Sequence, residues 1–105
     1  MKRSLLPKHA RMLNTLGENI RLARLRRELS TEQIAERAGI ARGTLVKVEK
    51  GDEDVAIGIY FRVLIALNLA DDILLLAKDD ILGRKLQDIG LTTRERAPKR
   101  TLNNE

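Results

Sequence analysis

The chain has 105 residues, which fits one domain with a single modest hydrophobic core. It contains no Cys and no Trp, and Tyr60 and Phe61 are its only aromatic residues. The core must therefore consist of Leu, Ile, Val and Ala, as in a helix bundle. The lack of cysteine excludes disulfides and thiolate metal sites and fits a reducing cytoplasm. This composition favours an all-α fold.

Few residues could form a catalytic or metal site. His9 is the only histidine, and Ser4 and Ser30 are the only serines, so no nucleophile and base can be paired. The most apolar stretch, residues 55–70, is interrupted by Arg62 and is too short for a membrane span of about 20 apolar residues. The basic N-terminal segment lacks the features of a signal peptide. We therefore expect a cytoplasmic protein that is not an enzyme and needs no cofactor or metal.

The net charge of +5 is unevenly distributed along the chain. Residues 1–50 contain 12 Lys and Arg against 5 Asp and Glu, residues 51–93 contain 4 against 8, and residues 94–105 contain 4 against 2. A basic first half and an acidic second half suggest one face for a polyanion and another for a different contact. Charge alone also fits an ordinary solvated surface.

The first helix is predicted over about residues 13–28, after a flexible basic arm over residues 1–12. Its apolar residues follow two stripes at helical spacing, so it should bury two sides. The stripes contain Leu16, Ile20 and Ala23, and Leu22, Leu25 and Leu29.

The second and third helices are predicted to be short and almost contiguous. Ser30 should cap the second, with Gln33 completing a capping box, and its inward residues are Ile34, Ala35 and Ala38. Gly39 can adopt the left-handed conformation that ends this helix. A third helix over about residues 42–50 would then bury Leu45 and Val48, with Gly51 as its C-terminal cap.

Three further segments are helical candidates. A helix over about residues 56–67 is expected after a possible cap at Asp54, with inward residues Ile57, Phe61, Leu64 and Leu67. A helix over residues 70–77 is expected next. Its apolar residues cover too wide a surface for one core to bury, which indicates a dimer interface at Ile73, Leu74, Leu75 and Leu76. A short helix is possible over residues 79–89, and residues 92–105 should be disordered.

Two short helices joined by a Gly-containing turn of three residues form the arrangement that inserts a helix into the DNA major groove. Arginine and lysine can hydrogen-bond guanine, lysine can also reach phosphate, and threonine and valine can contact a thymine methyl. Gly43 lets the helix backbone approach the bases closely. The alternative is an ordinary helical hairpin inside a bundle. The outward residues of the third helix are Arg42, Gly43, Thr44, Val46, Lys47 and Lys50.

Residues 29–51, LSTEQIAERAGIARGTLVKVEKG, strongly resemble the lambda-repressor-like, Cro-type (XRE) helix-turn-helix family. The resemblance covers about residues 13–76. It departs from the family at Ala41, where Ser or Thr usually caps the recognition helix. It implies a compact five-helix lambda-repressor-like DNA-binding domain over residues 13–78, with a C-terminal extension over residues 79–105.

The same resemblance implies roles for individual residues. It implies that Thr31 contacts phosphate and that Arg24 pairs with Glu49, whereas a solvated Arg24 is the alternative. It also implies that base edges are contacted by Arg42, Gly43, Thr44, Val46 and Lys47.

Residues 55–69, VAIGIYFRVLIALNL, with the basic N-terminal segment, also resemble HipB-type antitoxins. That resemblance implies an autoregulating repressor that binds a HipA-like kinase toxin. The alternatives are a stand-alone Cro-type or phage-like repressor without a toxin, and a protein-bridging interaction module. Each repressor reading implies a homodimer on double-stranded operator DNA. Residues 82–102 could contact a partner protein or, as a basic arm, nearby phosphates.

Overall fold

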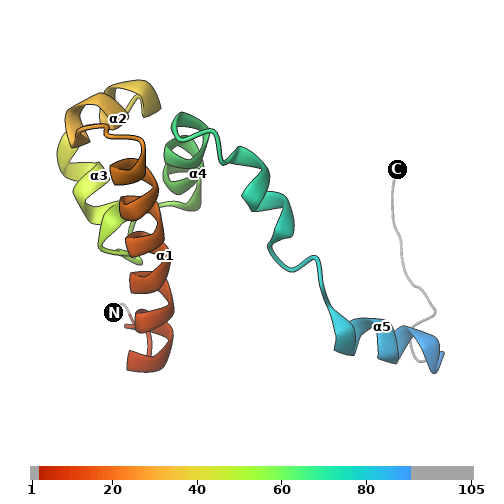
Figure 1. Ribbon diagram of the computed structural model, residues 1–105. Coiled ribbons are helices and arrows are strands. Elements are labelled where there is room, and N and C mark those ends of the chain that lie inside the picture. The colour runs from red at the N-terminus through yellow and green to blue at the C-terminus, as the bar shows by residue number, and fades with distance from the viewer. Residues whose placement is uncertain (1–2, 91–105) are drawn as a thin grey trace, which may run out of the picture. The chain divides into compact units, whose positions relative to one another are not determined.

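The computed structural model describes residues 3–90, and all the regular elements among them are helical, which confirms the all-α class. The chain divides into two compact units, Met1–Ile73 and Leu74–Glu105. Helices α1 to α4 belong to the first unit and pack around one core, and α5 belongs to the second (Figure 1). The elements are α1 (Pro7–Arg26), α2 (Thr31–Ala38), α3 (Arg42–Glu49), α4 (Ile57–Ala66), the 3-10 helix η1 (Ala70–Leu75) and α5 (Ile81–Asp88).

Helix α1 begins at Pro7 rather than near Leu13, so residues 7–12 are helical and the predicted flexible arm is wrong for this stretch. Proline at the first helical position is favourable because its missing N–H would have no partner there and its φ angle suits a helix. The backbone N–H of Leu5, just before the helix, donates to the Glu53 carboxylate at 3.4 Å. The prediction missed this start because these basic residues show no apolar period.

Only one side of α1 is buried. Ile20 and Ala23 are 2% exposed, as predicted, whereas Leu16, Leu22 and Leu25 remain 38–43% exposed. The predicted burial of two sides is therefore wrong. Of the second stripe, only Leu29, in the turn after the helix, packs against the core within residues 3–90, and Leu22 and Leu25 are exposed.

Helices α2 and α3 lie where the sequence predicts them. The Ser30 hydroxyl accepts from the Gln33 N–H at 3.1 Å, and the Gln33 side chain accepts from the Ser30 N–H at 2.8 Å, which confirms the capping box. The inward residues are also confirmed: Ile34, Ala35, Ala38, Leu45 and Val48 are at most 5% exposed.

Helix α4 presents a different face to the core from the one predicted. Tyr60 and Val63 are buried, whereas Ile57 is 66% exposed, and only Leu67 among the expected inward residues is fully buried. The helix is apolar almost all round, so periodicity could not select the inward side. The Tyr60 hydroxyl donates to the Asp52 carbonyl at 2.8 Å, and burial together with the Asp52 charge raises the pKa of Tyr60.

Two other predictions around α4 need correction. Its N-cap is Ala56, which makes no side-chain capping bond, so the predicted cap at Asp54 is wrong. Phe61 and Leu64, expected inward, are half-buried.

Neither η1 nor α5 contains a buried residue. Residues 70–75 form a 3-10 helix, shorter than the predicted α-helix over 70–77, and Ala77 has a left-handed φ of 61°. The predicted last helix is present as α5, which begins after Asp80 because the Asp80 carboxylate caps the Gly83 N–H at 3.0 Å. The predicted disordered tail over residues 92–105 lies outside the described residues.

Candidate nucleic-acid interface

The turn between α2 and α3 is tight because Gly39 adopts a left-handed φ of 71°. Its N–H donates to the Glu36 carbonyl at 3.1 Å, and the Ile40 N–H donates to the Ala35 carbonyl at 3.0 Å. These bonds satisfy the last carbonyls of α2 and allow α3 to start at Arg42. The two helices therefore form a helix-turn-helix, whose second helix begins after Ala41 without a side-chain cap.

Helix α3 is anchored by one side and presents the other side to solvent. Leu45 and Val48 have no exposed surface and join the core cluster that also contains Ile34 of α2 and Val63 of α4. The predicted contact residues lie on the remaining sides of the helix. Arg42, Gly43, Lys47 and Lys50 are exposed, and Thr44 and Val46 are half-buried. The surface of α3 and its C-cap therefore carries three basic side chains, Arg42, Lys47 and Lys50, and no carboxylate other than the paired Glu49.

Thr31, the predicted phosphate contact, is the first residue of α2 and lies beside the first residue of α3. The Arg42 Nε–H donates to the Thr31 hydroxyl at 3.2 Å. The same Nε lies 3.9 Å from a carboxylate oxygen of Glu32. The structure thus connects the two predicted contact residues and adds Glu32, which the sequence did not single out.

A buried ion pair joins α1 to the last residue of α3. The Arg24 Nε lies 2.7 Å from Glu49 Oε2 and its Nη2 lies 3.0 Å from Glu49 Oε1, while Nη1 donates to the Leu29 carbonyl at 3.0 Å. The side chains of Arg24 and Glu49 are 9% and 8% exposed. Hydrogen bonding to Glu49 raises the pKa of Arg24. This geometry fixes the C-terminal end of α3 against α1.

Three further residues hold α3 against α1, of which the sequence singled out only Gly51, as a cap. A Cβ on Gly17 would lie 2.6 Å from both the Glu49 carbonyl oxygen and the Gly51 nitrogen, which is closer than real Cβ contacts. A Cβ on Gly51, whose φ is 73°, would collide with the Leu13 carbonyl. The Asn14 amide donates to the Lys50 carbonyl at 2.8 Å. In the sequence, the only sign of this close crossing of α1 and α3 was Gly17, a glycine inside a predicted helix.

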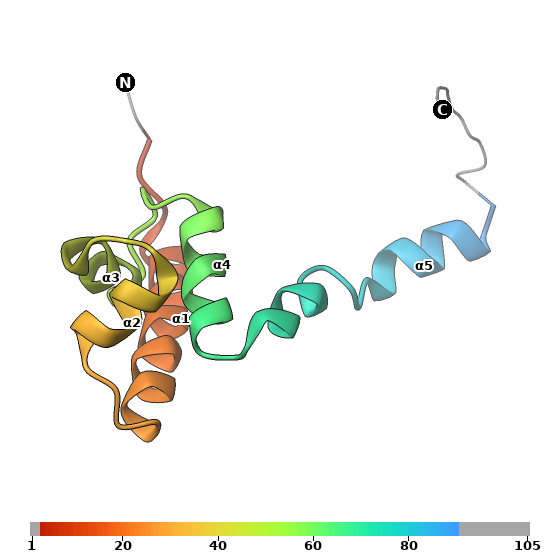
Figure 2. The same cartoon turned by 90° about the horizontal axis from the view of Figure 1, so that it is seen from above.

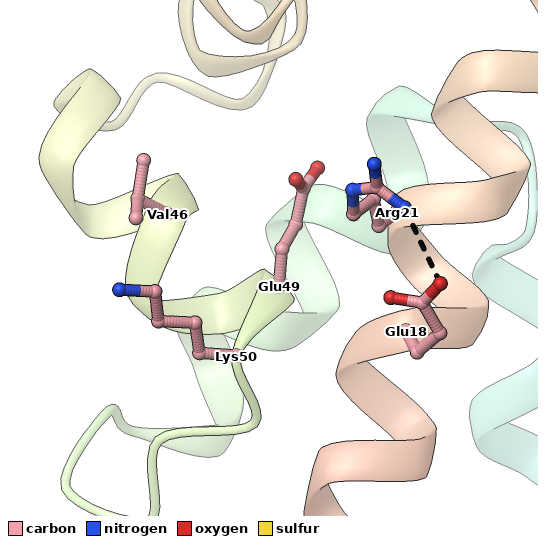
Figure 3. A pocket seen from close by; sticks show the side chains of 5 residues that line it. All are labelled: Glu18, Arg21, Val46, Glu49 and Lys50. Carbon is pink, nitrogen blue, oxygen red and sulfur yellow. Dashed lines mark hydrogen bonds and ion pairs between the residues drawn. The ribbon is translucent and has the colours of Figure 1, made fainter.

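A hollow of about 310 Å³ lies between α1 and α3. Figure 3 shows Val46 and Lys50 on one side of it and the Glu18–Arg21 ion pair of α1 across from them, with Glu49 between. Two carboxylates and two cations line it, so their charges compensate and the hollow has no net preference for an anion. The exposed basic residues Arg42 and Lys47 lie outside its lining and provide the positive surface.

Gly43 has no packing role within residues 3–90, because a Cβ there would meet no atom of them within 4 Å. We expect Gly43→Ala to raise the free energy of unfolding by up to about 1 kcal/mol, the difference in helix propensity. The same methyl would separate the α3 backbone from the bases, so we expect duplex affinity to fall. Thermal melts and fluorescence anisotropy measure the two effects.

Gly58 in α4 also has open space around its Cα and serves as the control. Gly58→Ala should stabilise the fold by a similar amount without changing duplex affinity. If Gly43→Ala left affinity at the parent value, the backbone of α3 would not approach the bases at this residue.

The described residues form neither a membrane-spanning helix nor a cluster of potential metal ligands. No helix within residues 3–90 has the length and apolar character to cross a membrane. The same residues contain no group of three or more His, Cys, Asp or Glu side chains that could hold a metal ion.

Comparison with known proteins agrees with the geometry of α2 and α3. Residues 20–74 match the helix-turn-helix family, and the match includes both helices, the turn between them and α4. Comparison with curated proteins yields no match. The matched region covers more than half of the 105 residues. The chain therefore belongs to the Cro/XRE-type helix-turn-helix family of DNA-binding transcription regulators.

Proposed function

We propose that the protein is a transcriptional repressor that binds a specific operator by inserting α3 into the major groove. The observation that carries this proposal is the division of α3 into a fully buried side, Leu45 and Val48, and an exposed basic side. An α-helix fits the B-DNA major groove, and the N-terminal residues of a recognition helix usually contact the base edges. A regulator bound in this way at a promoter blocks the polymerase.

The proposed contacts follow from the chemistry of each side chain. Arg42 hydrogen-bonds guanine, and Lys47 reaches a guanine acceptor or a phosphate. Thr44 and Val46 offer methyl groups to thymine. Lys50, one residue beyond α3, neutralises a phosphate. Thr31 donates its hydroxyl hydrogen to a phosphate while its oxygen accepts from Arg42.

We expect the full chain to bind a preferred duplex with an affinity that falls steeply with salt, because Lys and Arg displace counterions from the phosphates. Arg42→Ala or Lys47→Ala should weaken binding by about 1 to 3 kcal/mol if the lost contact is to a base. Arg42→Ala should relax discrimination at one base pair. Fluorescence anisotropy over a salt series measures both.

Lys78→Ala, outside the helix-turn-helix, is the control for loss of one positive charge. If both Arg42→Ala and Lys47→Ala kept the operator affinity of the parent, α3 would not be the recognition helix.

A homodimer is part of this proposal. Leu74, Leu75 and Leu76 are 63–69% exposed, and burial of one such side chain contributes about 1.5–3 kcal/mol. Ile73, the fourth residue of the predicted interface, is half-buried within its own unit. Two subunits related by a two-fold axis would place their recognition helices in half-sites about 34 Å apart, or a multiple of that distance.

Sedimentation should therefore show a dimer at micromolar concentration, and Leu75→Glu should shift it to a monomer. The control Lys78→Glu introduces the same side chain nearby without removing an apolar one. A monomeric parent, both free and on operator DNA, contradicts the dimer.

A second candidate function is an antitoxin that also binds a HipA-like kinase toxin. It is supported by the resemblance of residues 55–69 to HipB-type antitoxins and by the unburied apolar residues of α5, which lie outside the helix-turn-helix. Ile81, Leu82 and Ile89 are 58–67% exposed. A kinase-like gene in the adjacent reading frame would support this candidate, and its absence would leave the stand-alone repressor.

A further inference from the structure

Within residues 3–90, the Arg42 side chain makes no hydrogen bond or ion pair with another residue of α3. The side chain is 62% exposed. Its orientation therefore depends on polar contacts with another element.

That element is the first turn of α2. The Arg42 Nε–H donates to the Thr31 hydroxyl at 3.2 Å, and Nε lies 3.9 Å from Glu32 Oε2. Arginine carries five N–H donors, of which Nε has one and the two terminal nitrogens have four. With Nε engaged on α2, the terminal nitrogens keep all four donors, and they form the pair that matches O6 and N7 of guanine.

We propose that Glu32 is a positioning residue for specificity: together with Thr31 it holds the Nε side of Arg42, so that the two terminal nitrogens face one guanine. This inference rests on the proposed function, since it assigns α3 to the major groove. Glu32 is 74% exposed and acts through Arg42 rather than by touching the base. Orienting the guanidinium before binding reduces the ordering that the contact with guanine requires.

Glu32 has an opposite effect on contacts that do not depend on sequence. Its negative charge lies at the end of α2 that approaches phosphates, so it weakens binding to every duplex. Glu32 therefore lowers the affinity for every duplex and raises the discrimination between duplexes that differ at one base pair. A purely structural alternative exists, because a carboxylate in the first turn interacts favourably with the helix dipole. That role would change stability and leave the ratio of affinities for two duplexes unchanged.

The test measures this ratio with the full chain. The protein first selects its preferred duplex from a random library, and Arg42→Ala identifies the base pair at which discrimination is lost. A two-point arginine–guanine contact corresponds to about 5- to 150-fold discrimination. We expect Glu32→Gln to reduce the discrimination at that pair by about threefold or more, since much of the contact depends on orientation. Its affinity for the mismatched duplex should rise.

The matched control is Glu36→Gln, which removes the same charge from the same helix at an exposed residue. The Glu36 carboxylate makes no hydrogen bond or ion pair among residues 3–90, and its backbone carbonyl, which accepts from Gly39, is unchanged by the substitution. It should keep the discrimination of the parent. A second control combines Glu32→Gln with Arg42→Ala. If Glu32 acts through Arg42, the charge removal has no further effect on discrimination in that background.

The outcomes separate the two proposals. Loss of discrimination in Glu32→Gln at the pair identified by Arg42→Ala, and at no other pair, supports the inference. Two outcomes overturn the inference and leave the proposed function standing. In the first, Arg42→Ala loses discrimination while Glu32→Gln keeps it. In the second, Glu32→Gln reduces discrimination by the same factor in the Arg42→Ala background as in the parent. If Arg42→Ala changes no position, the inference is overturned, and Lys47→Ala then decides whether α3 binds the groove. If the parent selects no duplex, the proposed function fails and the inference fails with it.

Discussion

We expect Glu49→Ala to lower the free energy of unfolding by about 3 kcal/mol, the lower end of the range for breaking a buried ion pair. The substitution leaves the Arg24 guanidinium, 9% exposed, with only the Leu29 carbonyl as an acceptor. An unpaired buried charge costs more than the pair itself contributed, because its desolvation is no longer compensated. For a domain of this size the melting temperature should fall by roughly 12 °C or more.

The Glu18–Arg21 pair provides the comparison, because its side chains are 46% and 52% exposed. Glu18→Ala should change stability by less than about 0.5 kcal/mol, as is usual for an exposed pair within one helix. Thermal melts of both variants and the parent measure the difference. Equal melting temperatures for Glu49→Ala and the parent would contradict the prediction and show that water stabilises the Arg24 charge in place of Glu49.

We expect Gly17→Ala to destabilise the fold by about 3 kcal/mol, at the upper end of the cost of overpacking a core. The added methyl would lie 2.6 Å from the Glu49 carbonyl oxygen and 2.7 Å from the Val48 carbonyl oxygen. These are backbone atoms of the last turn of α3, which cannot rotate away as a side chain can. The two helices must therefore separate, and the buried bonds of Arg24 to Glu49 must lengthen.

The substitution should also weaken operator binding, because α3 is displaced from the rest of the domain. At temperatures where the variant is still folded, we expect at least about a tenfold loss of affinity, equivalent to one base contact. Gly58→Ala again provides the control, since it adds a methyl to a helix in open space. A Gly17→Ala variant with the stability and operator affinity of the parent would contradict the close crossing.

The sequence by itself determined the elements whose signals are local. Helix α2 has both predicted ends, because Ser30 and Gln33 form a capping box and Gly39 adopts a left-handed conformation. The inward residues of α2 and α3 follow from helical periodicity, because each of these helices has one clear apolar side. The family match over residues 20–74 was foreseeable for the same reason, since its motif consists of these caps, turns and buried positions.

The sequence was less informative where no local pattern selects one face. Helix α4 is apolar nearly all round, so only packing decided that Tyr60 and Val63, and not Ile57, face the core. The second apolar stripe of α1 was expected to be buried, yet Leu22 and Leu25 are not covered within residues 3–90. Periodicity indicates that a face is apolar but not whether a partner covers it.

The tertiary structure alone decided how α3 is held and how its first residue is oriented. Gly17 and Asn14 contact residues 31 to 36 positions away, and Glu32 lies across the turn from Arg42, 10 residues on. No local pattern connects these three residues to α3. Arg24 and Glu49 lie 25 residues apart, and the resemblance, not their spacing, implied the pair. Caps and periodicity depend on neighbours within about one helical turn. The approach of two helices depends on the whole fold, because each contact requires every element of the core to be in place.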